Sequence, residues 1–555
     1  MKKIKVYLIA LGISISAVLS YGFADNYFHI SKNLDIFSSL YKELNTYYVD
    51  ETQPGDLMKT AIDAMLQSLD PYTNYIPESD IEDFRFMTTG QYGGIGALIH
   101  KDSNFVVISE PYKGFPAYRA GLKAGDVIIK IDGKSIKGKN TQEVSDFLKG
   151  QAGTMVKITV KRPGTDKSIE KEVIRENIKI DEVPYYGMLD NEVGYIKLVS
   201  FTQTAAKSFE DAFKDLKENH GMKKLVFDLR GNGGGLLMEA VKIVNAFVPK
   251  GKVVVETKGK REEWDATYRT PAEPIDTEIP VVILVNGSSA SASEIVSGAL
   301  QDYDRGVIVG KQTFGKGLVQ QTRPLSYNAQ LKVTVAKYYI PSGRCIQKVD
   351  YSHKDVNGKA KNIPDSMIHS FKTLVSKREV FDGKGIKPDV ITDERKMSKI
   401  AQVLMGKQLI FGFATEYALK HDSISEPKYF ELDDDTYAAF KNYLSDKDYS
   451  YQTESERLLE KLEETAKKEK YYDGAEEEYA DLKLKIAEDK EDDLDKFSDQ
   501  IKQLLENEIV SRYYYQDGRI EQSLNDDEDV QKALEIINGA AYNEILAGTF
   551  VKEKE

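Results

Sequence analysis

Apolar residues recur every three to four positions near both ends of the chain and gather in short β-branched runs between those ends. Over residues 25–87, Ile36, Leu40 and Leu44 follow the interval of a helix that packs on one face. The same interval returns over residues 401–555, between clusters of acidic residues. We therefore expect an N-terminal helical region and a C-terminal helical domain with a solvated acidic face.

Residues 88–178 have the pattern of a small β domain. Short runs rich in Val and Ile end in glycine-containing turns, which is typical of strands and hairpins. We predict strands over residues 97–99, 106–108, 127–131 and 156–160, the last of which closes the domain, and a helix over Thr141–Lys149 with Thr141 as its N-cap.

Residues 179–400 alternate strands with amphipathic helices, which favours an α/β layer. The polar stretch 348–377 has the composition of a surface loop or insertion. We predict strands over residues 194–198, 225–229, 281–285 and 306–310, and helices over residues 205–219, 236–248 and 290–303.

Charge sets the last part of the chain apart. The net charge is −13, and residues 401–555 hold 20 basic and 39 acidic side chains, so the net negative charge lies there. An acidic chain is not expected to bind nucleic acid, because phosphate contacts need a basic surface. The single cysteine, Cys345, excludes an internal disulfide, and the six histidines form no HExxH motif. We expect no metal and no other cofactor.

The first 24 residues have the features of an export signal. Lys2, Lys3 and Lys5 precede an almost uncharged run over residues 6–24, in which small residues offer a cleavage site. The run is also just long enough to span a bilayer, so a cleaved signal and a retained anchor stay open. Either reading places the protein outside the cytoplasm, in the periplasm or another extracytoplasmic compartment.

A serine-rich segment after a buried strand is the first candidate for chemistry. Ser291 lies in the middle of an alternating Ser-Ala run that opens a helix, where free backbone N–H groups can stabilise an oxyanion. Ser291 and Glu294 also have the spacing of a capping box. In that interpretation the serine stabilises the start of the helix and has no catalytic role. Three serines alternating with alanines exceed what a cap requires.

A glycine-flanked lysine, Lys316, is the second candidate. A lysine in a turn is usually solvated, but a desolvated lysine with a lowered pKa can act as a general base. Gln320, four residues later, could orient the amine without restoring its charge.

A glycine-rich turn over residues 228–236 is the third candidate. It could bind a dinucleotide, with Glu256 as the ribose-binding acid, but its spacing is GxGxG and not GxGxxG. The other interpretation is an oxyanion hole or a peptide-binding loop.

Glycines also precede the first strand of the β domain. A loop containing Gly94, Ile95, Gly96 and Ala97 exposes backbone N–H groups that could hold a C-terminal carboxylate, although a simple tight turn would look similar. Together with Pro116-Ala117, the segment 120–127 and Ile131-Asp132-Gly133, the pattern resembles a PDZ domain, which adds a peptide's C-terminal strand to its sheet edge.

The order of motifs resembles the C-terminal processing peptidases, also called tail-specific proteases. The resemblance covers about residues 35–395. It rests on SASASE at 289–294, FGKG at 314–317 with Val319-Gln320, DLRGNGGG at 228–235, Leu69-Asp70-Pro71, Pro341-Ser342-Gly343-Arg344 and Gly385-Ile386-Lys387-Pro388-Asp389.

This resemblance implies a role for each matching residue. Ser291 would be the nucleophile, Lys316 the general base and Gln320 the residue that holds the lysine. The backbone N–H groups of Ala292 and Gly234 would form the oxyanion hole. Asp302 matches a supporting acid of the family, which we interpret as structural rather than catalytic.

The resemblance also implies an architecture and a set of partners. The fold would be a crotonase/ClpP-like α/β protease core over residues 179–400 with an inserted PDZ domain that binds substrate C-termini and gates the site. Lys149-Gly150 stands where some relatives carry Arg-Gly, so the gating contact can differ here. The terminal helical regions could form a homodimer or an adaptor surface, and residues 1–24 could anchor the chain in an inner membrane.

Two alternatives stay open at this point. One is a PDZ-centred binding protein with an inactive protease core. The other is an acyl-transfer enzyme on a related core, because an oxyanion hole is not unique to proteolysis.

Overall fold

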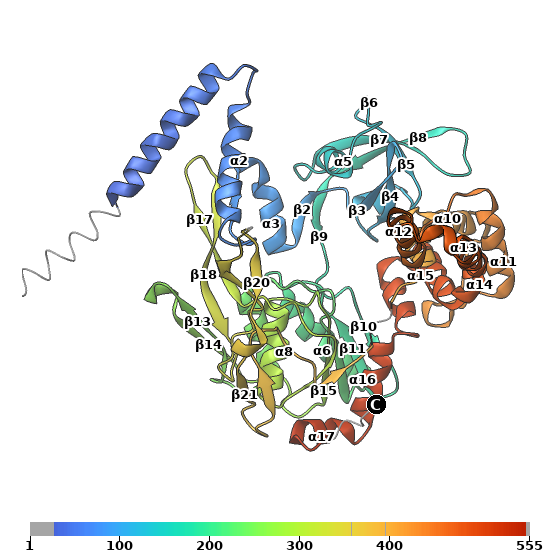
Figure 1. Ribbon diagram of the computed structural model, residues 1–555. Coiled ribbons are helices and arrows are strands. Elements are labelled where there is room, and N and C mark those ends of the chain that lie inside the picture. Colours follow the sequence, from blue (N-terminus) through green and yellow to red (C-terminus); the bar gives the residue numbers. More distant parts are fainter. Residues whose placement is uncertain (1–26, 357, 394–395, 551–555) are drawn as a thin grey trace, which may run out of the picture.

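The computed structural model describes residues 27–550 apart from residues 357 and 394–395 (Figure 1). The export signal or anchor predicted for residues 1–24 lies outside the described residues. Within the described part, none of the helices combines the length and apolar character needed to cross a membrane.

The N-terminal region is mostly helical but also contributes a strand to the core. A helix over residues 27–47 projects from the body of the molecule (Figure 1). Many of its apolar side chains are exposed. Strand β1 (Asn74–Ile76), which the sequence did not predict, pairs antiparallel with β18 (Gln330–Tyr339). The other helices here are α2 (Pro54–Gln67), η1 (Glu78–Asp80) and α3 (Ile81–Thr89).

The β domain has the predicted strands and helix, with two corrections. The N-cap of α5 (Thr141–Leu148) is Asn140, whose side chain accepts the Glu143 N–H, whereas Thr141 is the first helical residue. The strand predicted to close the domain is followed by β8, with which it pairs. The sheet has the order β3-β4-β5-β7-β8, with β6 beside β5. Its elements are β3 (Ala97–Asp102), β4 (Phe105–Pro111), α4 (Pro116–Arg119), β5 (Val127–Ile131), β6 (Lys134–Ser135), β7 (Met155–Lys161) and β8 (Ser168–Ile174), and the flanking β2 (Gln91–Gly94) pairs with β9 (Glu176–Lys179).

The core is built on a largely parallel sheet in the order β10-β11-β12-β15-β16-β23. Strand β10 is antiparallel to β11, and the remaining neighbours are parallel, as expected where helices connect the strands. The strands are β10 (Tyr185–Met188), β11 (Val193–Lys197), β12 (Lys224–Asp228), β15 (Val281–Val285), β16 (Val307–Gly310) and β23 (Val390–Ile391).

Both faces of this sheet are covered by helices. Phe227 and Ile283 belong to the apolar cluster under α6 (Ala205–Asn219), α7 (Leu237–Asn245) and α8 (Ala292–Asp302). On the other face, Tyr195 and Val282 pack with Val530 and Ile537 from the end of the chain. The covering helices there are α16 (Glu528–Asn538) and α17 (Ala541–Ala547) (Figure 1).

The described part of residues 401–555, which ends at residue 550, is therefore mostly helical as predicted, but it is not one separate module. Helices α16 and α17 complete the core, because a parallel sheet must be buried on both faces and residues 179–400 cover only one. The preceding helices are α9 (Lys399–Gly406), α10 (Leu409–Lys420), η4 (Pro427–Tyr429), α11 (Asp434–Tyr443), η5 (Leu444–Asp446), α12 (Glu454–Glu469), η6 (Tyr472–Gly474), α13 (Glu476–Glu491), α14 (Asp493–Lys496) and α15 (Ser498–Ser523). Most of them share a separate apolar cluster beside the β domain, to which α12, η6 and α13 contribute no described side chain.

A second, antiparallel sheet borders the core in the order β1-β18-β13-β14, with β17 also paired to β18. The polar stretch 348–377, predicted as a surface loop or insertion, contains β19 and β20, which pair with each other, and β21, which pairs with β22 just beyond the stretch. The bounds are β13 (Val253–Gly259), η2 (Glu262–Trp264), β14 (Ala266–Arg269), β17 (Leu318–Pro324), β19 (Val349–Lys354), β20 (Ala360–Asn362), η3 (Asp365–Met367), β21 (Ser370–Lys372) and β22 (Glu379–Phe381).

Candidate active site

Ser291 occupies a strained position between β15 and α8. Its φ of 55° and ψ of −111° are unusual for a residue with a side chain, and such strain concentrates at functional sites. The loop before it is held by Ser289, whose Oγ accepts the Asn286 N–H at 3.0 Å and donates to Leu229 O at 2.8 Å. The strand thus ends in a fixed turn that leaves Ser291 partly exposed at the start of the helix.

The buried carboxylate of Glu294 joins the serine and lysine segments. Its Oε2 accepts the backbone N–H of Ser291 at 2.8 Å and that of Lys316 at 2.9 Å. Its Oε1 accepts Thr313 Oγ1 at 2.6 Å and the Gly315 N–H at 2.7 Å. Burial raises the pKa of Glu294, and these four donors oppose that rise. The predicted capping carboxylate is present, and it also fixes the lysine loop.

The amine of Lys316 lies in a partly dry environment. Burial first, and then the positive charge of Lys332, lower the pKa of Lys316 to about 8, while Glu294 and Asp70 act in the opposite direction. The Nζ atom lies 4.4 Å from the centroid of the Tyr72 ring. The desolvation that a lysine base requires is therefore present at this position.

Gln320 does not hold Lys316 in this structure. Its Nε2 donates instead to Thr334 Oγ1 at 3.2 Å. Among the described residues, the Ser291 hydroxyl and the Lys316 amine also share no hydrogen bond. Glu294 joins the backbones of Ser291 and Lys316, but the side-chain contacts expected among Ser291, Lys316 and Gln320 are not formed in the described structure.

The glycine turn after β12 lies directly against the serine. Gly234 has a φ of 99°, and a methyl group on its Cα would be 2.8 Å from Ser291 Cβ and 2.9 Å from Ala292 N, so only glycine fits there. The Gly234 N–H donates to Asn232 Oδ1 at 2.9 Å. Within the described chain, the Ala292 N–H has no hydrogen-bond acceptor. The Ala292 and Gly234 N–H groups, which are the two expected oxyanion donors, are therefore adjacent. The Gly234 N–H is already hydrogen-bonded to Asn232.

Asp302 lies at the other end of α8 from Ser291. Its fully buried carboxylate pairs with Arg344 at 2.8 Å and accepts the Ser342 N–H at 2.9 Å. Burial raises the pKa of Asp302, and Arg344 opposes that rise. This geometry is that of a structural ion pair between the helix and the following loop.

Comparison with known proteins connects this geometry to a family. The profile described as peptidase family S41 matches residues 192–355, and a PDZ profile matches residues 107–162. A carboxy-terminal-processing protease of Bartonella bacilliformis is 39% identical over 321 residues, which cover 57% of this chain and 73% of that relative. The chain belongs to peptidase family S41. It is a serine peptidase that carries a PDZ domain.

Other similar proteins cover comparable parts of the S41 peptidase. A probable CtpA-like serine protease of Staphylococcus aureus is 36% identical over 370 residues, which cover 66% of each chain. Two solved structures, the photosystem II D1 C-terminal processing protease and a putative S41 protease of Bacteroides fragilis, are 28% and 17% identical, with TM-scores of 0.35 and 0.37. Each match covers 65% of this chain. It covers 93% of the D1 processing protease and 90% of the Bacteroides fragilis protein. A profile described as the C-terminal helical domain of a probable PDZ-protease matches residues 400–537.

The PDZ loop of the S41 peptidase has a defined backbone geometry. The Ile95 carbonyl accepts the Ala117 N–H at 2.8 Å, and the Gly96 carbonyl accepts the Tyr112 N–H at 2.9 Å. Gly94 ends β2, and Ala97 begins β3, which is an edge strand beside α5. A sheet edge next to a helix is where a peptide can add a strand. After α5, the Lys149 amine lies 6.0 Å from the centroid of the Tyr92 ring.

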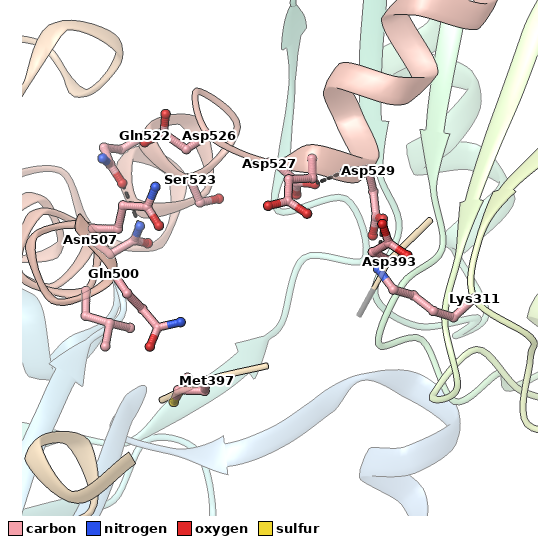
Figure 2. Close-up of a pocket in the computed structure, with 13 residues that line it drawn as sticks. Lys311, Asp393, Met397, Gln500, Asn507, Gln522, Ser523, Asp526, Asp527 and Asp529 are labelled. Carbon is pink, nitrogen blue, oxygen red and sulfur yellow. Dashed lines mark hydrogen bonds and ion pairs between the residues drawn. The ribbon is translucent and has the colours of Figure 1, made fainter. Parts of the chain in front are cut away.

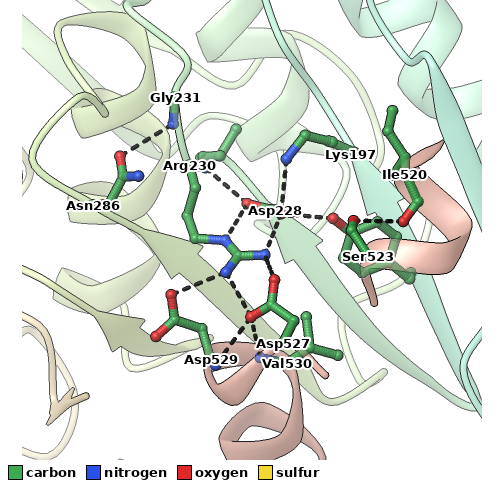
Figure 3. A network of polar contacts seen from close by, with 12 residues as sticks. Lys197, Asp228, Arg230, Gly231, Asn286, Ile520, Ser523, Asp527, Asp529 and Val530 are labelled. Carbon is green, nitrogen blue, oxygen red and sulfur yellow. Dashed lines mark hydrogen bonds and ion pairs between the residues drawn. The ribbon is translucent and has the colours of Figure 1, made fainter. Parts of the chain in front are cut away.

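Several residues of the site were not found by sequence reasoning. The buried Tyr338 places its Oη 2.5 Å from Lys316 O and 3.2 Å from Ser291 O, so it braces the same two segments as Glu294. Arg230, in the glycine turn, pairs with Asp527 and Asp529 near the end of the chain (Figure 3). The acidic cluster at 526–529 belongs to the predicted solvated face, but Asp527 and Asp529 are instead paired with Arg230.

Proposed function

We propose that the S41 peptidase cuts peptide bonds with a Ser–Lys dyad formed by Ser291 and Lys316. The observation that carries this proposal is the shared carboxylate oxygen of Glu294, which holds both backbones at one point. A lysine with a pKa of about 8 is neutral in roughly a tenth of molecules at pH 7, which suffices for a general base.

The reaction would follow from these positions. Ser291 Oγ attacks the peptide carbonyl carbon and passes its proton to neutral Lys316. The Ala292 and Gly234 N–H groups stabilise the oxyanion, a contribution of about 3–4 kcal/mol for a donor of this kind. The C–N bond then breaks, and Lys316 protonates the leaving amine. Water, activated by the same lysine, hydrolyses the acyl-enzyme.

The described conformation corresponds to a resting state in this proposal. Reaction requires the Lys316 amine to leave the Tyr72 ring for Ser291 Oγ, Gln320 to leave Thr334, and the Gly234 N–H to leave Asn232. Binding of a substrate C-terminus at the PDZ edge would supply this rearrangement, since a ligand shifts a conformational equilibrium by its preference for one state.

The setting of the reaction is part of the same proposal. The basic and apolar pattern of residues 1–24 supports export and extracytoplasmic cleavage, with the segment cleaved or kept as an anchor. The parallel sheet with helices on both faces supports a core of the crotonase/ClpP-like kind.

The test is cleavage of an unfolded protein that ends in an apolar residue. Ser291→Ala and Lys316→Ala should each lower kcat by at least about 1,000-fold, while Ser288→Ala, at an exposed neighbouring serine, should not. A substrate with an amidated C-terminus should bind less well. Binding of C-terminal peptides with no cleavage by the wild type would favour the binding-protein alternative, and full activity of both alanine variants would overturn the dyad.

A further inference from the structure

Arg230 joins the candidate oxyanion turn to the end of the chain. It precedes Gly234 by four residues, and its side chain is only 14% exposed. Its Nη2 donates to Asp228 at 2.8 Å and to Asp527 at 2.7 Å, and its Nη1 donates to Asp527 at 2.8 Å and to Asp529 at 2.9 Å (Figure 3). When two nitrogens of one guanidinium donate to the same carboxylate, they fix the orientation of the two groups as well as the distance between them.

Asp529 also reaches the loop that carries Lys316. Its Oδ1 accepts Lys311 Nζ at 2.9 Å and Thr392 Oγ1 at 2.5 Å. Burial would raise the pKa of Asp529, but Thr392, Lys311 and Arg230 together lower it, so the carboxylate is anionic. One carboxylate from α16 thus contacts Arg230, in the turn that carries Gly234, and Lys311, at the start of the loop that carries Lys316.

The other end of the same segment contacts the PDZ domain. Arg519 of α15 forms an ion pair with Glu110 of β4. The rings of Tyr118 and Tyr515 lie 5.4 Å apart. The PDZ domain and the loops that carry Gly234 and Lys316 are thereby joined by a short stretch of chain between residues 519 and 529.

A cavity of about 320 Å³ borders this stretch between the helical domain and the core (Figure 2). Lys311, Asp527 and Asp529 line it from the core side, and Gln500, Asn507 and Gln522 line it from the helical domain. Well-packed interiors transmit strain, whereas a cavity leaves side chains room to move. The segment can therefore shift beside the cavity without displacing packed side chains.

We propose that residues 519–529 couple the PDZ domain to the oxyanion turn, with Asp527 and Asp529 as positioning residues that act through Arg230. This inference rests on the proposed dyad mechanism. Loss of either aspartate would remove a charged acceptor from the largely buried Arg230 and leave Asp228 and the other aspartate to hold it, so the orientation of the turn should change.

The first test measures positioning with the full-length chain. In Asp527→Asn/Asp529→Asn, kcat and the rate of Ser291 labelling by a fluorophosphonate should both fall about 10- to 100-fold, because oxyanion donors would be misplaced. KM and PDZ affinity for a C-terminal peptide should change by less than about 2-fold. Asp526→Asn, at an exposed aspartate that does not contact Arg230, is the matched control.

The second test measures coupling. A non-cleavable C-terminal peptide should change the labelling rate of the wild type by about 3-fold or more, and Glu110→Gln should abolish this response while the basal rate persists. Arg230→Lys keeps the positive charge but cannot donate two parallel hydrogen bonds to one carboxylate. This variant tests the same contact if Asp527→Asn/Asp529→Asn does not fold. It should lower kcat and leave KM unchanged.

The outcomes separate this inference from the proposed mechanism. If Ser291→Ala is inactive while Asp527→Asn/Asp529→Asn and Arg230→Lys label and cleave like the wild type, positioning is overturned and the dyad stands. If the C-terminal peptide does not change the labelling rate of the wild type, the proposed coupling is overturned. If Ser291→Ala cleaves normally, the dyad itself has failed.

Discussion

Ser291 and Lys316 donate their backbone N–H groups to the same carboxylate oxygen, Oε2 of Glu294. The two residues are therefore fixed to each other through their main chains, whatever their side chains do. This arrangement separates two tasks. The buried carboxylate keeps the segments together, and the side chains remain free to engage or disengage.

Replacing Glu294 with glutamine should test that separation. Both carboxylate oxygens of Glu294 accept hydrogen bonds, and in glutamine one of them is replaced by an NH2 group that cannot accept. Two of the four donors, which are Ser291, Thr313, Gly315 and Lys316, would then lose their acceptor. We expect the free energy of unfolding to fall by about 2–4 kcal/mol and kcat to fall by about 100-fold or more. Denaturant unfolding and steady-state kinetics measure both. Glu239→Gln, a buried carboxylate on α7, is the control and should retain kcat.

The pH dependence of kcat/KM should report Lys316. Only the neutral amine accepts a proton, and its pKa is lowered to about 8. Activity should therefore be low at pH 6, rise through about pH 8 and level off above it. Thermal unfolding at each pH would show that the protein stays folded over this range. A rate that falls between pH 7 and 9 would contradict the assignment of Lys316 as the base.

Lys332 should control the position of this pH profile. It lies on β18 opposite Thr322 and Asn74, and its charge helps to lower the pKa of Lys316. In Lys332→Gln the lysine base should become harder to deprotonate, so the rise in kcat/KM should move to higher pH. Lys337→Gln, at an exposed lysine of the same strand, should leave the profile in place. An unchanged profile in Lys332→Gln would show that Lys332 has no influence on the base.

Lys316→Met should be inactive but more stable than the wild type near pH 7. Burial disfavours the charged lysine, so its pKa is lower in the folded than in the unfolded chain, and this cost is fully present below pH 8. Removing the charge should raise the free energy of unfolding by up to about 3 kcal/mol. In the wild type, stability should rise between about pH 8 and the ordinary lysine pKa of 10.5. A less stable methionine variant would mean that the buried amine is not penalised.

Truncation after Ser523 should destroy the core. Without α16 and α17, one face of the parallel sheet, including Tyr195, Val282 and Leu284, would be exposed to water. We expect insoluble protein or loss of cooperative unfolding, measured by scattering and by far-UV circular dichroism. A soluble, active truncated chain would show that these helices are dispensable.

The sequence was informative where structure is local. The alternation of strands and helices predicted the positions of β11, β12 and β15 and of α6 closely, because their periodicity is determined by burial. The motifs around Ser291 and Lys316 lie together in the structure. Family membership follows from the relatives, while the roles of the individual residues remain predictions.

Long-range relationships left no local pattern to detect. Strand β1 has only three residues, too few to show an alternation, and Asn140 and Thr141 are both common N-caps. Arg230 and Asp527 are almost 300 positions apart. The sequence around either residue contains no pattern that predicts the pairing. The contact expected between Gln320 and Lys316 depends on conformational state, which spacing does not encode.

The closure of the central sheet by α16 and α17 has a consequence for the order in which the enzyme is made. The segments that carry Ser291 and Lys316, which follow β15 and β16, are synthesised well before residues 528–547, yet the sheet cannot be fully buried until those residues have emerged. An incomplete nascent chain would thus hold every proposed catalytic side chain without a stable core to align them. The proposed activity would therefore appear only after residues 528–547 have been synthesised and have packed against the sheet.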